Sequence, residues 1–483
     1  MARLNLPYAS YVMRSSPASS ARLLNAFVEK LPEDAKAPYA LVRCPGIVEF
    51  ITVGTGPIYA LHEALGYLWV ISGSRLYRVS SSSVVTDLGS VGSFSRIDID
   101  NNATTIVVVN QPNAYYYDTV TSTFGQITDV DFTSRGASDV EFLDNFLLFV
   151  EPDSGRFFGS DVGSATSFNS LNFATAEGSP DNLVGLKVDH RQALLLGEKS
   201  VEIWELVGGG GFPFARAANG FIEIGCFNGK SAVKIDQTVI WFAPDYTVRR
   251  LNGITPERIS HAGIEQQMQN CTASSAKGME YSQDGHSFYI LSFTEGTFVY
   301  DCTTKQWHER QSYGYAYWRA QCHAQAFRNG PDSVRGLELV GDITSNKIGY
   351  LDPPARGTVA IQYQEWGAIQ RMEWTYQPVY AEGNTAFHDR LEIILETGVG
   401  QTLGQGLDPE MMMEVSDDGG INWEPLPNEK IGMQGKTRTT VVFQQLGSAE
   451  QRVYRGAVTD PVKIVIADTQ LHARGAKPIK RAA

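Results

Sequence analysis

The chain has 483 residues, of which 43% are hydrophobic and 11% aromatic, a composition that indicates a globular protein and excludes a disordered one. Its formal net charge of −13 at pH 7 argues against tight binding of nucleic acid through a broad basic face. The five cysteines are scattered and form no Cys-x-x-Cys pair, so neither a zinc site nor a disulfide framework is indicated, and a reducing cytoplasmic origin fits best. No segment is typical of a signal peptide or a membrane span, and we expect a soluble protein.

Residues 1–55 form an irregular lead-in with widely spaced prolines at positions 7, 17, 32, 38 and 45. Because proline interrupts helices, this spacing excludes long helices and favours an extended N-terminal arm. The arm is either a strap that lies across the following domain or a segment that reaches a neighbouring subunit, and the sequence leaves both possibilities open.

Residues 56–353 repeat one phrase: a β-branched and aromatic run, a polar turn and a second run. The clearest copies are residues 239–242 with 247–251, and residues 288–293 with 297–300. Further copies begin at Tyr67, Thr105, Phe146, Ala193 and Leu337. Each phrase is the signature of a β-hairpin, and a recurrence at intervals of about 45 residues indicates a repeat architecture.

An additional strand is predicted before most of the hairpins, at residues 94–99, 138–142, 183–188 and 231–235. This combination of strands is that of a propeller blade, because one small sheet cannot cover both of its faces, whereas blades stacked around an axis bury them. We therefore predict an all-β chain with a closed β-propeller over residues 56–353, and the pattern does not decide between six and seven blades. We expect the following aromatic residues to lie on strands: Trp69, Tyr116, Phe158, Trp204, Phe242 and Tyr300.

The blade phrase stops at Pro353 and Pro354. Alternating apolar residues continue at 359–363, 391–395, 439–443 and 462–466, which predicts a smaller all-β domain, most simply a β-sandwich, over residues 354–471. Residues 472–483 carry basic side chains and no acid, and we expect a flexible basic tail there.

Three short motifs could carry chemistry. Residues 416–423 read Ser-Asp-Asp-Gly-Gly-Ile-Asn-Trp and resemble the Asp-box of sialidase-type propellers, a turn clamped by its Asp and Trp that does no catalysis. Residues 228–231 (Asn-Gly-Lys-Ser) lack the glycine spacing of a phosphate-binding loop, and we interpret them as a turn. Residues 98–102 contain two aspartates but lack the glycine and terminal glutamate of a strong calcium loop.

Catalytic constellations are not evident. A glycosidase would need paired acids or an arginine cluster, and Arg249–Arg250 is the only adjacent arginine pair. The histidines are isolated from one another, at positions 62, 190, 261, 286, 308, 323, 388 and 472. Cys322 and His323 are neighbours on a predicted strand, so their side chains point to opposite faces and cannot act as nucleophile and base. We therefore expect no enzyme, and no catalytic, cofactor-binding or metal site.

The order of phrases along the chain resembles the packaged-DNA stabilization proteins of short-tailed phages, the tail accessory factors that form the tail nozzle. The resemblance covers nearly the whole chain, although no single motif is diagnostic. The matching segments are residues 25–29 (Asn-Ala-Phe-Val-Glu), 41–46 (Leu-Val-Arg-Cys-Pro-Gly), 73–77 (Gly-Ser-Arg-Leu-Tyr), 182–186 leading into 200–204, 214–225, and 415–423. Cys44 and the basic tail depart from the family pattern.

The resemblance implies a structural protein of the virion tail, assembled in the host cytoplasm without a cofactor. It implies a ring, of six copies in the family, that lies below the portal and its adaptor protein, prolongs the DNA channel and retains packaged DNA. It also implies a platform for tailspikes or fibres and for a needle or plug, while genomic DNA passes without tight binding. The alternative is a glycan-binding or glycan-processing propeller, that is, a receptor-binding module or a glycosidase.

Overall fold

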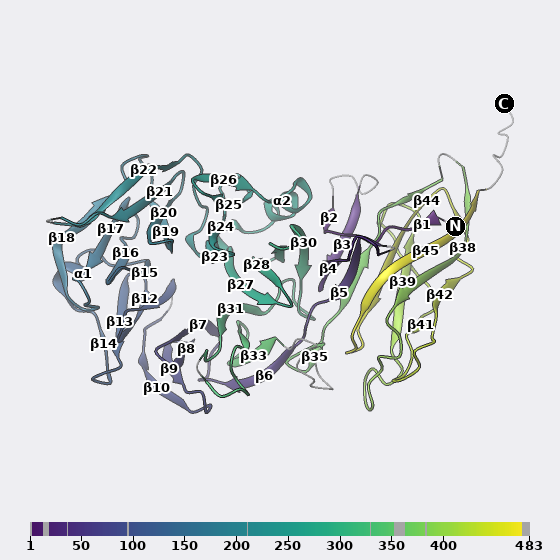
Figure 1. Cartoon of the computed structure of the whole chain (residues 1–483), viewed down its shortest axis with the longest axis horizontal. Coiled ribbons are helices and arrows are strands. Elements are labelled where there is room, and N and C mark those ends of the chain that lie inside the picture. Colours follow the sequence, from purple (N-terminus) through teal and green to yellow (C-terminus); the bar gives the residue numbers. More distant parts are fainter. Residues whose placement is uncertain are drawn as a thin grey trace.

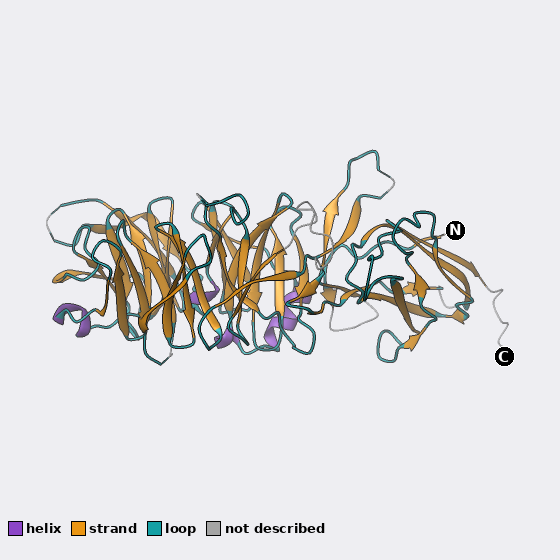
Figure 2. Ribbon diagram, turned by 90° about the horizontal axis from the view of Figure 1, so that it is seen from below, coloured by secondary structure: helices purple, strands orange, loops and turns teal. Residues whose placement is uncertain are grey.

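The computed structural model describes residues 2–12, 19–35, 37–93, 96–209, 211–328, 330–351, 363–381 and 384–475. The first two thirds of the chain form a ring of small sheets, and a second module built mainly of later strands lies beside the ring (Figure 1). Seen from the side, the ring is a disk whose strands run roughly along its short axis, and the helices are few and peripheral (Figure 2).

The ring is a β-propeller whose described residues form seven four-stranded units, and in six of them the strands follow one another along the chain. The strands are β7 (Ile58–Ala64), β8 (Tyr67–Ser72), β9 (Arg75–Val79) and β10 (Val85–Ser90) in blade 1; β11 (Ile97–Asn101), β12 (Thr105–Asn110), β13 (Asn113–Asp118) and β14 (Thr123–Gln126) in blade 2; β15 (Asp139–Leu143), β16 (Phe146–Val150), β17 (Arg156–Ser160) and β18 (Phe168–Thr175) in blade 3; β19 (Leu183–Asp189), β20 (Gln192–Gly197), β21 (Val201–Leu206) and β22 (Phe214–Ile222) in blade 4; and β23 (Val233–Ile235), β24 (Thr238–Phe242), β25 (Val248–Asn252) and β26 (Thr255–Arg258) in blade 5.

Blades 6 and 7 connect the propeller to the rest of the chain. Blade 6 holds β27 (Lys277–Gln283), β28 (His286–Ser292), β29 (Thr297–Asp301) and β30 (Gln306–Arg310), and blade 7 holds β31 (Ala320–Gln325), β32 (Glu338–Asp342), β33 (Lys347–Leu351) and β6 (Ile47–Thr52). Helix α1 (Val130–Thr133) precedes blade 3, and α2 (Ala262–Gln269) and the 3₁₀ turn η1 (Gly229–Ser231) flank blade 5. The predicted propeller is confirmed, and the hairpins expected from the sequence are the central strands of seven blades.

The aromatic residues expected on strands lie there. They occupy β8, β13, β17, β21, β24 and β29, and all are buried or half-buried: Trp69, Tyr116, Phe158, Trp204, Phe242 and Tyr300. Large side chains on successive blades pack together, as in the cluster in which Val107 and Val109 of blade 2 share a core with Phe149 of blade 3. This contact between blade faces is the burial that no isolated blade achieves.

The ring is closed by a strand from near the start of the chain. Strand β6 pairs antiparallel with β33, with Ile47 opposite Leu351 and Thr52 opposite Lys347. The expected extended arm over residues 1–55 is therefore wrong for this segment, and the propeller begins before residue 56. Pro7, Pro32, Pro38 and Pro45 lie between the short strands, which leaves residues 39–43 and 47–52 free to form ladders. Pro17 lies outside the described residues.

The second module is a sandwich of two sheets, as predicted. One contains β2 (Tyr11–Val12), β3 (Ser20–Leu24), β36 (Met372–Thr375), β37 (Val379–Tyr380), β39 (Glu410–Ser416), β40 (Glu424–Pro425), β41 (Glu429–Lys430) and β44 (Gln451–Val458); the other contains β1 (Ala2–Arg3), β4 (Ala26–Lys30), β5 (Tyr39–Arg43), β38 (Ala386–Leu395), β42 (Val441–Gln444), β43 (Ser448–Ala449) and β45 (Val465–Gly475). The short strands β34 (Gln364–Glu365) and β35 (Ala368–Ile369) extend blade 7. Residues of both sheets share one core that includes Trp374, Leu391 and Tyr454.

The predicted tail boundary at residue 472 is wrong, because β45 continues to Gly475. Arg474 donates to Asp389 on the neighbouring strand β38 at 2.6 Å, and cross-strand pairing keeps this end of the chain in the sheet. Residues 476–483, with the remaining basic side chains of the expected tail, lie outside the described residues. The same is true of the predicted domain boundary at Pro353 and Pro354 and of most of the predicted strand 359–363.

The propeller and the sandwich share hydrogen-bonded structure. Strand β3 pairs with β36 of the sandwich and makes one parallel bridge to blade 6, with Leu24 opposite Glu309. The Asn25 side chain donates to the main-chain oxygens of Gln311, at 2.9 Å, and of Arg371, at 2.8 Å. The N-terminal strands therefore fix the sandwich to the propeller through main-chain contacts as well as through side chains.

A buried cation reinforces this junction. The Arg310 side chain is fully buried, with its guanidinium 4.1 Å from the centre of the Trp318 ring and 3.7 Å from the Glu365 carboxylate. Trp318 donates its indole N–H to the same carboxylate at 2.9 Å. Since a buried charge is tolerated only with partners of this kind, the three residues hold blade 6, blade 7 and the strand β34 in one arrangement.

Closure by β6 generates a test of the fold. Ile47 is fully buried, so Ile47→Ala is expected to lower the free energy of unfolding by about 2–5 kcal/mol. The matched control is Glu49→Gln on the same strand, because the Glu49 carboxylate is exposed and pairs with Lys347 at 2.7 Å; its loss is expected to cost less than about 1 kcal/mol. Urea unfolding followed by tryptophan fluorescence measures both, and equal losses would contradict closure by β6.

Candidate functional site

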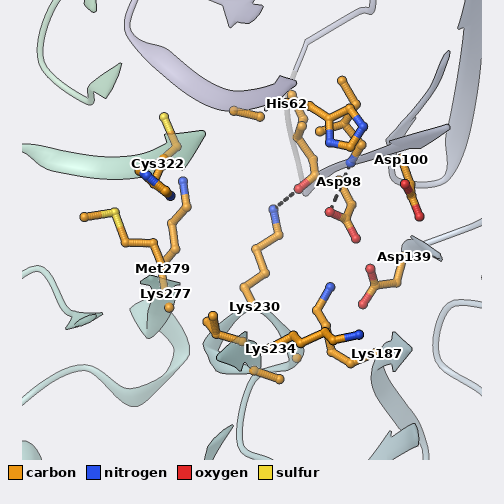
Figure 3. A pocket seen from close by; sticks show the side chains of 18 of the residues that line it. His62, Asp98, Asp100, Asp139, Lys187, Lys230, Lys234, Lys277, Met279 and Cys322 are labelled. Atoms are coloured by element: carbon orange, nitrogen blue, oxygen red, sulfur yellow. Dashed lines mark hydrogen bonds between the residues drawn. The ribbon is translucent and has the colours of Figure 1, made fainter. Parts of the chain in front are cut away.

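A cavity lies on the propeller axis, where the innermost strands of the blades converge. Its volume is ≈ 470 Å³, and its lining comes from β7, β11, β15, β19, β23, β27, β31 and η1. Figure 3 shows Asp98, Asp100 and Asp139 of blades 2 and 3 on one side with Lys187 below them, Lys277 on the opposite side, and Lys230 between. We call this space the axial cavity.

The carboxylates of the axial cavity are held by backbone amides. The Phe142 N–H donates to Asp100 Oδ2 at 2.6 Å, and the Leu186 N–H donates to Asp139 Oδ2 at 3.0 Å. Burial raises the pKa of Asp100 to about 6. Burial, and then the nearby charge of Asp98, raises the pKa of Asp139 well above its ordinary value. Burial therefore disfavours the charged form of both carboxyl groups.

Asp98 differs from these two carboxyl groups because its surroundings favour the charged form. Burial opposes ionisation, but the positive charge of Lys187 and a hydrogen bond with the Asp139 carboxyl lower the pKa of Asp98 to about 2. Lys187 pairs with Glu141 across blades 3 and 4, and the carboxylates around it raise its pKa in spite of burial. A cation is thus fixed among the acids, and this compensation makes the charges of the axis tolerable.

The remaining lysines reach into or across the cavity from blades 5 and 6. Lys234 pairs with Asp189 at 3.2 Å. Lys230 donates to the Ile97 carbonyl, and Lys277 donates to the Tyr59 carbonyl at 3.0 Å. Burial, followed by the charge of Lys277, lowers the pKa of Lys230 to about 7.

The turn at residues 228–231 is confirmed as a turn and is not a phosphate loop. It forms η1, in which Asn228 Oδ1 accepts from the Lys230 N–H at 3.0 Å and Ser231 donates to the Asn228 carbonyl at 2.6 Å. The turn also determines that the Lys230 side chain enters the axial cavity (Figure 3). The aspartates of segment 98–102 line the same cavity, but among the described residues no group of three or more His, Cys, Asp or Glu side chains could hold a metal ion.

The Asp-box-like motif is a hairpin turn between β39 and β40. Asp418 Oδ1 accepts from the N–H groups of Ile421 and Asn422, both at 2.9 Å, and from the Ser416 hydroxyl at 2.7 Å. These donors lower the pKa of Asp418 to about 2. The Trp423 ring lies 4.0 Å below the Arg455 guanidinium, and its indole N–H donates to the Gly420 carbonyl at 3.0 Å. Each group clamps the turn.

Other side chains that the sequence singled out are engaged separately. Arg249 pairs with Asp245 at 2.8 Å, and Arg250 pairs with Asp236 at 2.7 Å, so the two arginines do not form one anion site.

The adjacent Cys322 and His323 are also directed to different partners. The Cys322 thiol contacts the Ile58 carbonyl on blade 1, whereas His323 Nε2 lies 2.5 Å from a Glu338 oxygen on the next strand of its own blade. The thiol and the imidazole therefore do not form a nucleophile and base pair, which agrees with the expectation from their alternation along the strand.

No helix among the described residues has the length and apolar character of a membrane span.

The sequence analysis did not predict that charged residues of different blades meet in the axial cavity. Its charged residues sit on strands that the sequence did predict: Asp98, Asp139, Glu141, Lys187 and Lys234. The available signal was the recurrence of ionisable residues in the first strand of each repeat, because the first strands of propeller blades meet at the axis. Lys277 lies on a first strand that the repeat phrase did not include.

The Asp-box geometry predicts the effects of two substitutions. Asp418→Ala removes the acceptor for two backbone N–H groups and is expected to lower the melting temperature of the sandwich. Trp423→Ala removes the ring under Arg455 and is expected to cost on the order of 1–3 kcal/mol. Ile421→Ala is the control, because Ile421 is in the same turn and 76% exposed. Calorimetry of the three variants measures the effect, and unchanged melting of the first two would refute the clamp.

The raised pKa of Asp100 predicts a pH effect. A carboxyl group whose pKa rises from 3.8 unfolded to about 6 folded contributes stability that is complete below pH 3.8 and is lost as the pH rises through 6. The melting temperature of Asp100→Asn, which keeps an acceptor for the Phe142 N–H, is therefore expected to improve relative to the native chain between pH 4 and 7. Asp118→Asn, at an exposed aspartate with a lowered pKa, should show no such trend in this range. A difference in melting temperature between Asp100→Asn and the native chain that does not change with pH would contradict the prediction.

The solved structures to which the chain is similar are distant. The extracellular domain of a one-component system from B. thetaiotaomicron has a TM-score of 0.44 and 10% identity, covering 87% of this chain and 59% of that chain. The Pan2 WD40 domain of Neurospora crassa has a TM-score of 0.39 and 11% identity, covering 64% of this chain and 92% of that chain. The comparison with curated proteins gave no match.

Two family models match the chain, and they divide it as the structure does. The model described as "Bacteriophage P22 Gp10, beta-propeller" matches residues 30–355, and its range begins before β6, the strand that closes the ring. The model described as "Bacteriophage P22 Gp10, beta-sandwich" matches residues 372–474, a range that ends within the final strand β45. The resemblance to the packaged-DNA stabilization proteins is confirmed, and the chain belongs to the bacteriophage P22 Gp10 family of structural proteins of the phage tail nozzle.

Proposed function

We propose that this structural tail protein assembles as a ring, of six copies, below the portal and its adaptor protein, where it prolongs the exit channel and retains packaged DNA. The observation that supports the proposal most directly is the family match over both modules. Its partners are other copies of itself, the portal adaptor, tailspikes or tail fibres, and a needle or plug. Assembly takes place in the host cytoplasm.

The construction of the chain supports a mechanical role. The sandwich and the propeller are joined by β3 and by the buried Arg310–Glu365–Trp318 contact. A domain pair whose interface contains shared strands and a buried, compensated charge resists relative motion better than one joined by a linker alone. A ring of such subunits keeps its geometry under the pressure of packaged DNA.

We infer that the protein acts without catalysis. Two lysines of the axial cavity are neutralised in ion pairs, Lys187 with Glu141 and Lys234 with Asp189. The Asp-box-like turn uses its aspartate to bind its own backbone. These groups already bind partners within the chain, and a glycan-processing role is therefore not supported.

We propose that retained DNA is blocked at the exit and is not held by its phosphates. The formal net charge of −13 per chain produces a field that repels DNA overall, and it is repeated in every copy of a ring. Several exposed arginines are already paired with acids: Arg75 with Asp87, Arg191 with Asp144, and Arg474 with Asp389. A channel of this character lets DNA slide.

Removal of the protein tests the proposed function. Phage particles produced without it are expected to package DNA and then lose it, which a count of DNA-filled heads and cryo-electron microscopy of the tail would show. The purified protein is expected to bind duplex DNA weakly at physiological salt in a filter-binding assay, since strong binding would require salt-sensitive phosphate contacts.

The outcomes separate the two parts of the proposal. Filled, stable and infectious particles without the protein would overturn its role in retention. Tight, salt-dependent DNA binding by the purified protein would instead leave retention in place and replace blocking by direct phosphate contact. Complementation with the Glu49→Gln variant serves as a control for expression, because this substitution lies in an exposed ion pair.

A further inference from the structure

Two of the lysines that line the axial cavity lack an acidic partner. Among the described residues neither Lys230 nor Lys277 forms an ion pair, and each ammonium donates to one backbone carbonyl, of Ile97 and of Tyr59 respectively. An ammonium group has three donors, so each lysine keeps donors that no described protein atom satisfies. Figure 3 shows both side chains directed into the cavity.

The charges of the other two lysines of the cavity are compensated by acidic side chains. Lys187 is paired with Glu141, and Lys234 is paired with Asp189. Both pairs connect neighbouring blades and leave no uncompensated cation. Lys230 and Lys277 come from the turn before blade 5 and from blade 6, and the charge of Lys277 opposes protonation of the buried Lys230.

The aspartates of the axial cavity already accept hydrogen bonds from other groups, and none of them forms an ion pair with Lys230 or Lys277. Asp139 accepts from the Arg96 guanidinium at 3.2 Å and from the Leu186 N–H. Asp100 accepts from the Phe142 N–H. Asp98 attracts both lysines from a distance but makes no direct ion pair with either among the described residues.

We propose that the axial cavity binds a small oxyanion between Lys230 and Lys277. The shared chemistry is a compact group of anionic oxygens, as in sulfate, inorganic phosphate or a carboxylate. Such a group accepts hydrogen bonds from both ammonium ions and removes the repulsion between them. The cavity volume of ≈ 470 Å³ leaves room for an anion of this size together with water.

The position of Lys230 is built by the local fold. The Asn228 side chain caps η1, and the Ser231 hydroxyl binds both the Asn228 carbonyl and, at 3.2 Å, the Phe242 N–H. These bonds hold the backbone from which Lys230 projects. Lys277 projects from the regular ladder of β27, opposite Ser292. The two amines are therefore presented by ordered backbone, which lowers the entropy lost on binding.

The proposal has a pH signature. The anion binds the protonated amines, and the empty-cavity pKa of Lys230 is lowered by burial and Lys277 to about 7, opposed by Asp98 and Asp139 and reinforced by Arg96. Lys277 is influenced chiefly by burial and, in the opposite direction, by Cys322 and Asp98. Affinity for sulfate, which keeps its charge over this range, is therefore expected to fall between pH 6 and pH 8.

The test measures the melting temperature and the heat of binding of the full chain with sodium sulfate, sodium phosphate and sodium acetate, each against sodium chloride at equal ionic strength. Sulfate is expected to stabilise the native chain in a saturable manner. The response is expected to fall at least tenfold in Lys230→Met and in Lys277→Met, which keep most of the aliphatic stem. Lys234→Met is the matched control, because Lys234 lines the same cavity but already has Asp189 as its partner.

Folding of the variants is checked in chloride alone, where Lys230→Met and Lys277→Met are expected to melt no lower than the native chain, since each removes an uncompensated cation. The absence of a saturable sulfate effect, or an equal effect in all three lysine variants, would overturn the proposal. Stabilisation by phosphate and sulfate but not by acetate would assign the site to tetrahedral oxyanions. If one lysine variant does not fold, the sulfate response of the other variant and the pH dependence of sulfate binding to the native chain test the proposal.

Discussion

The antiparallel pairing of β6 with β33 is the contact on which the architecture depends. A propeller has no free edge along its ring only when its last blade is complete, and here the outer strand of that blade comes from the start of the chain. The connection also brings β3, β4 and β5 to the side of the ring, where they become strands of the sandwich. One pairing thus closes the propeller and determines where the second module is attached.

Closure also explains the unusual polarity of the axis. The innermost strands are brought together only in the complete ring, and they carry aspartate, glutamate and lysine into a narrow space. The interleaving of Lys187 with Glu141, Asp98 and Asp139 compensates most of these charges in place, which limits the cost of burying them. Lys230 and Lys277 are the exceptions, and for this reason they are the informative residues of the cavity.

The sequence predicted the elements that local patterning encodes. The hairpin phrases identify the central strands of the blades because alternation and turn residues are short-range signals. The Asp-box-like turn was interpreted correctly because its clamp lies within eight neighbouring positions, from Ser416 to Trp423. The number of blades could not be read, since the seventh blade is completed by β6, which lies far away along the chain.

Long-range pairing accounts for the errors as well. Residues 1–55 were expected to form an arm because their strands are short and separated by prolines, and their partners in β33, β36 and β45 are visible only in the fold. The end of β45 was mistaken for a tail because basic residues such as Arg474 look solvated until Asp389 is placed beside them. The axial cavity stayed hidden for the same reason, since its lysines and carboxylates are on different blades.

The position of these partners has a consequence for biosynthesis. Strands β3 to β6 are synthesised before their partners β33, β36 and β45, and Ala2 pairs with Leu471. The early strands therefore leave the ribosome with unpaired edges. A chain that lacks these later strands therefore lacks both the closed ring and the finished sandwich.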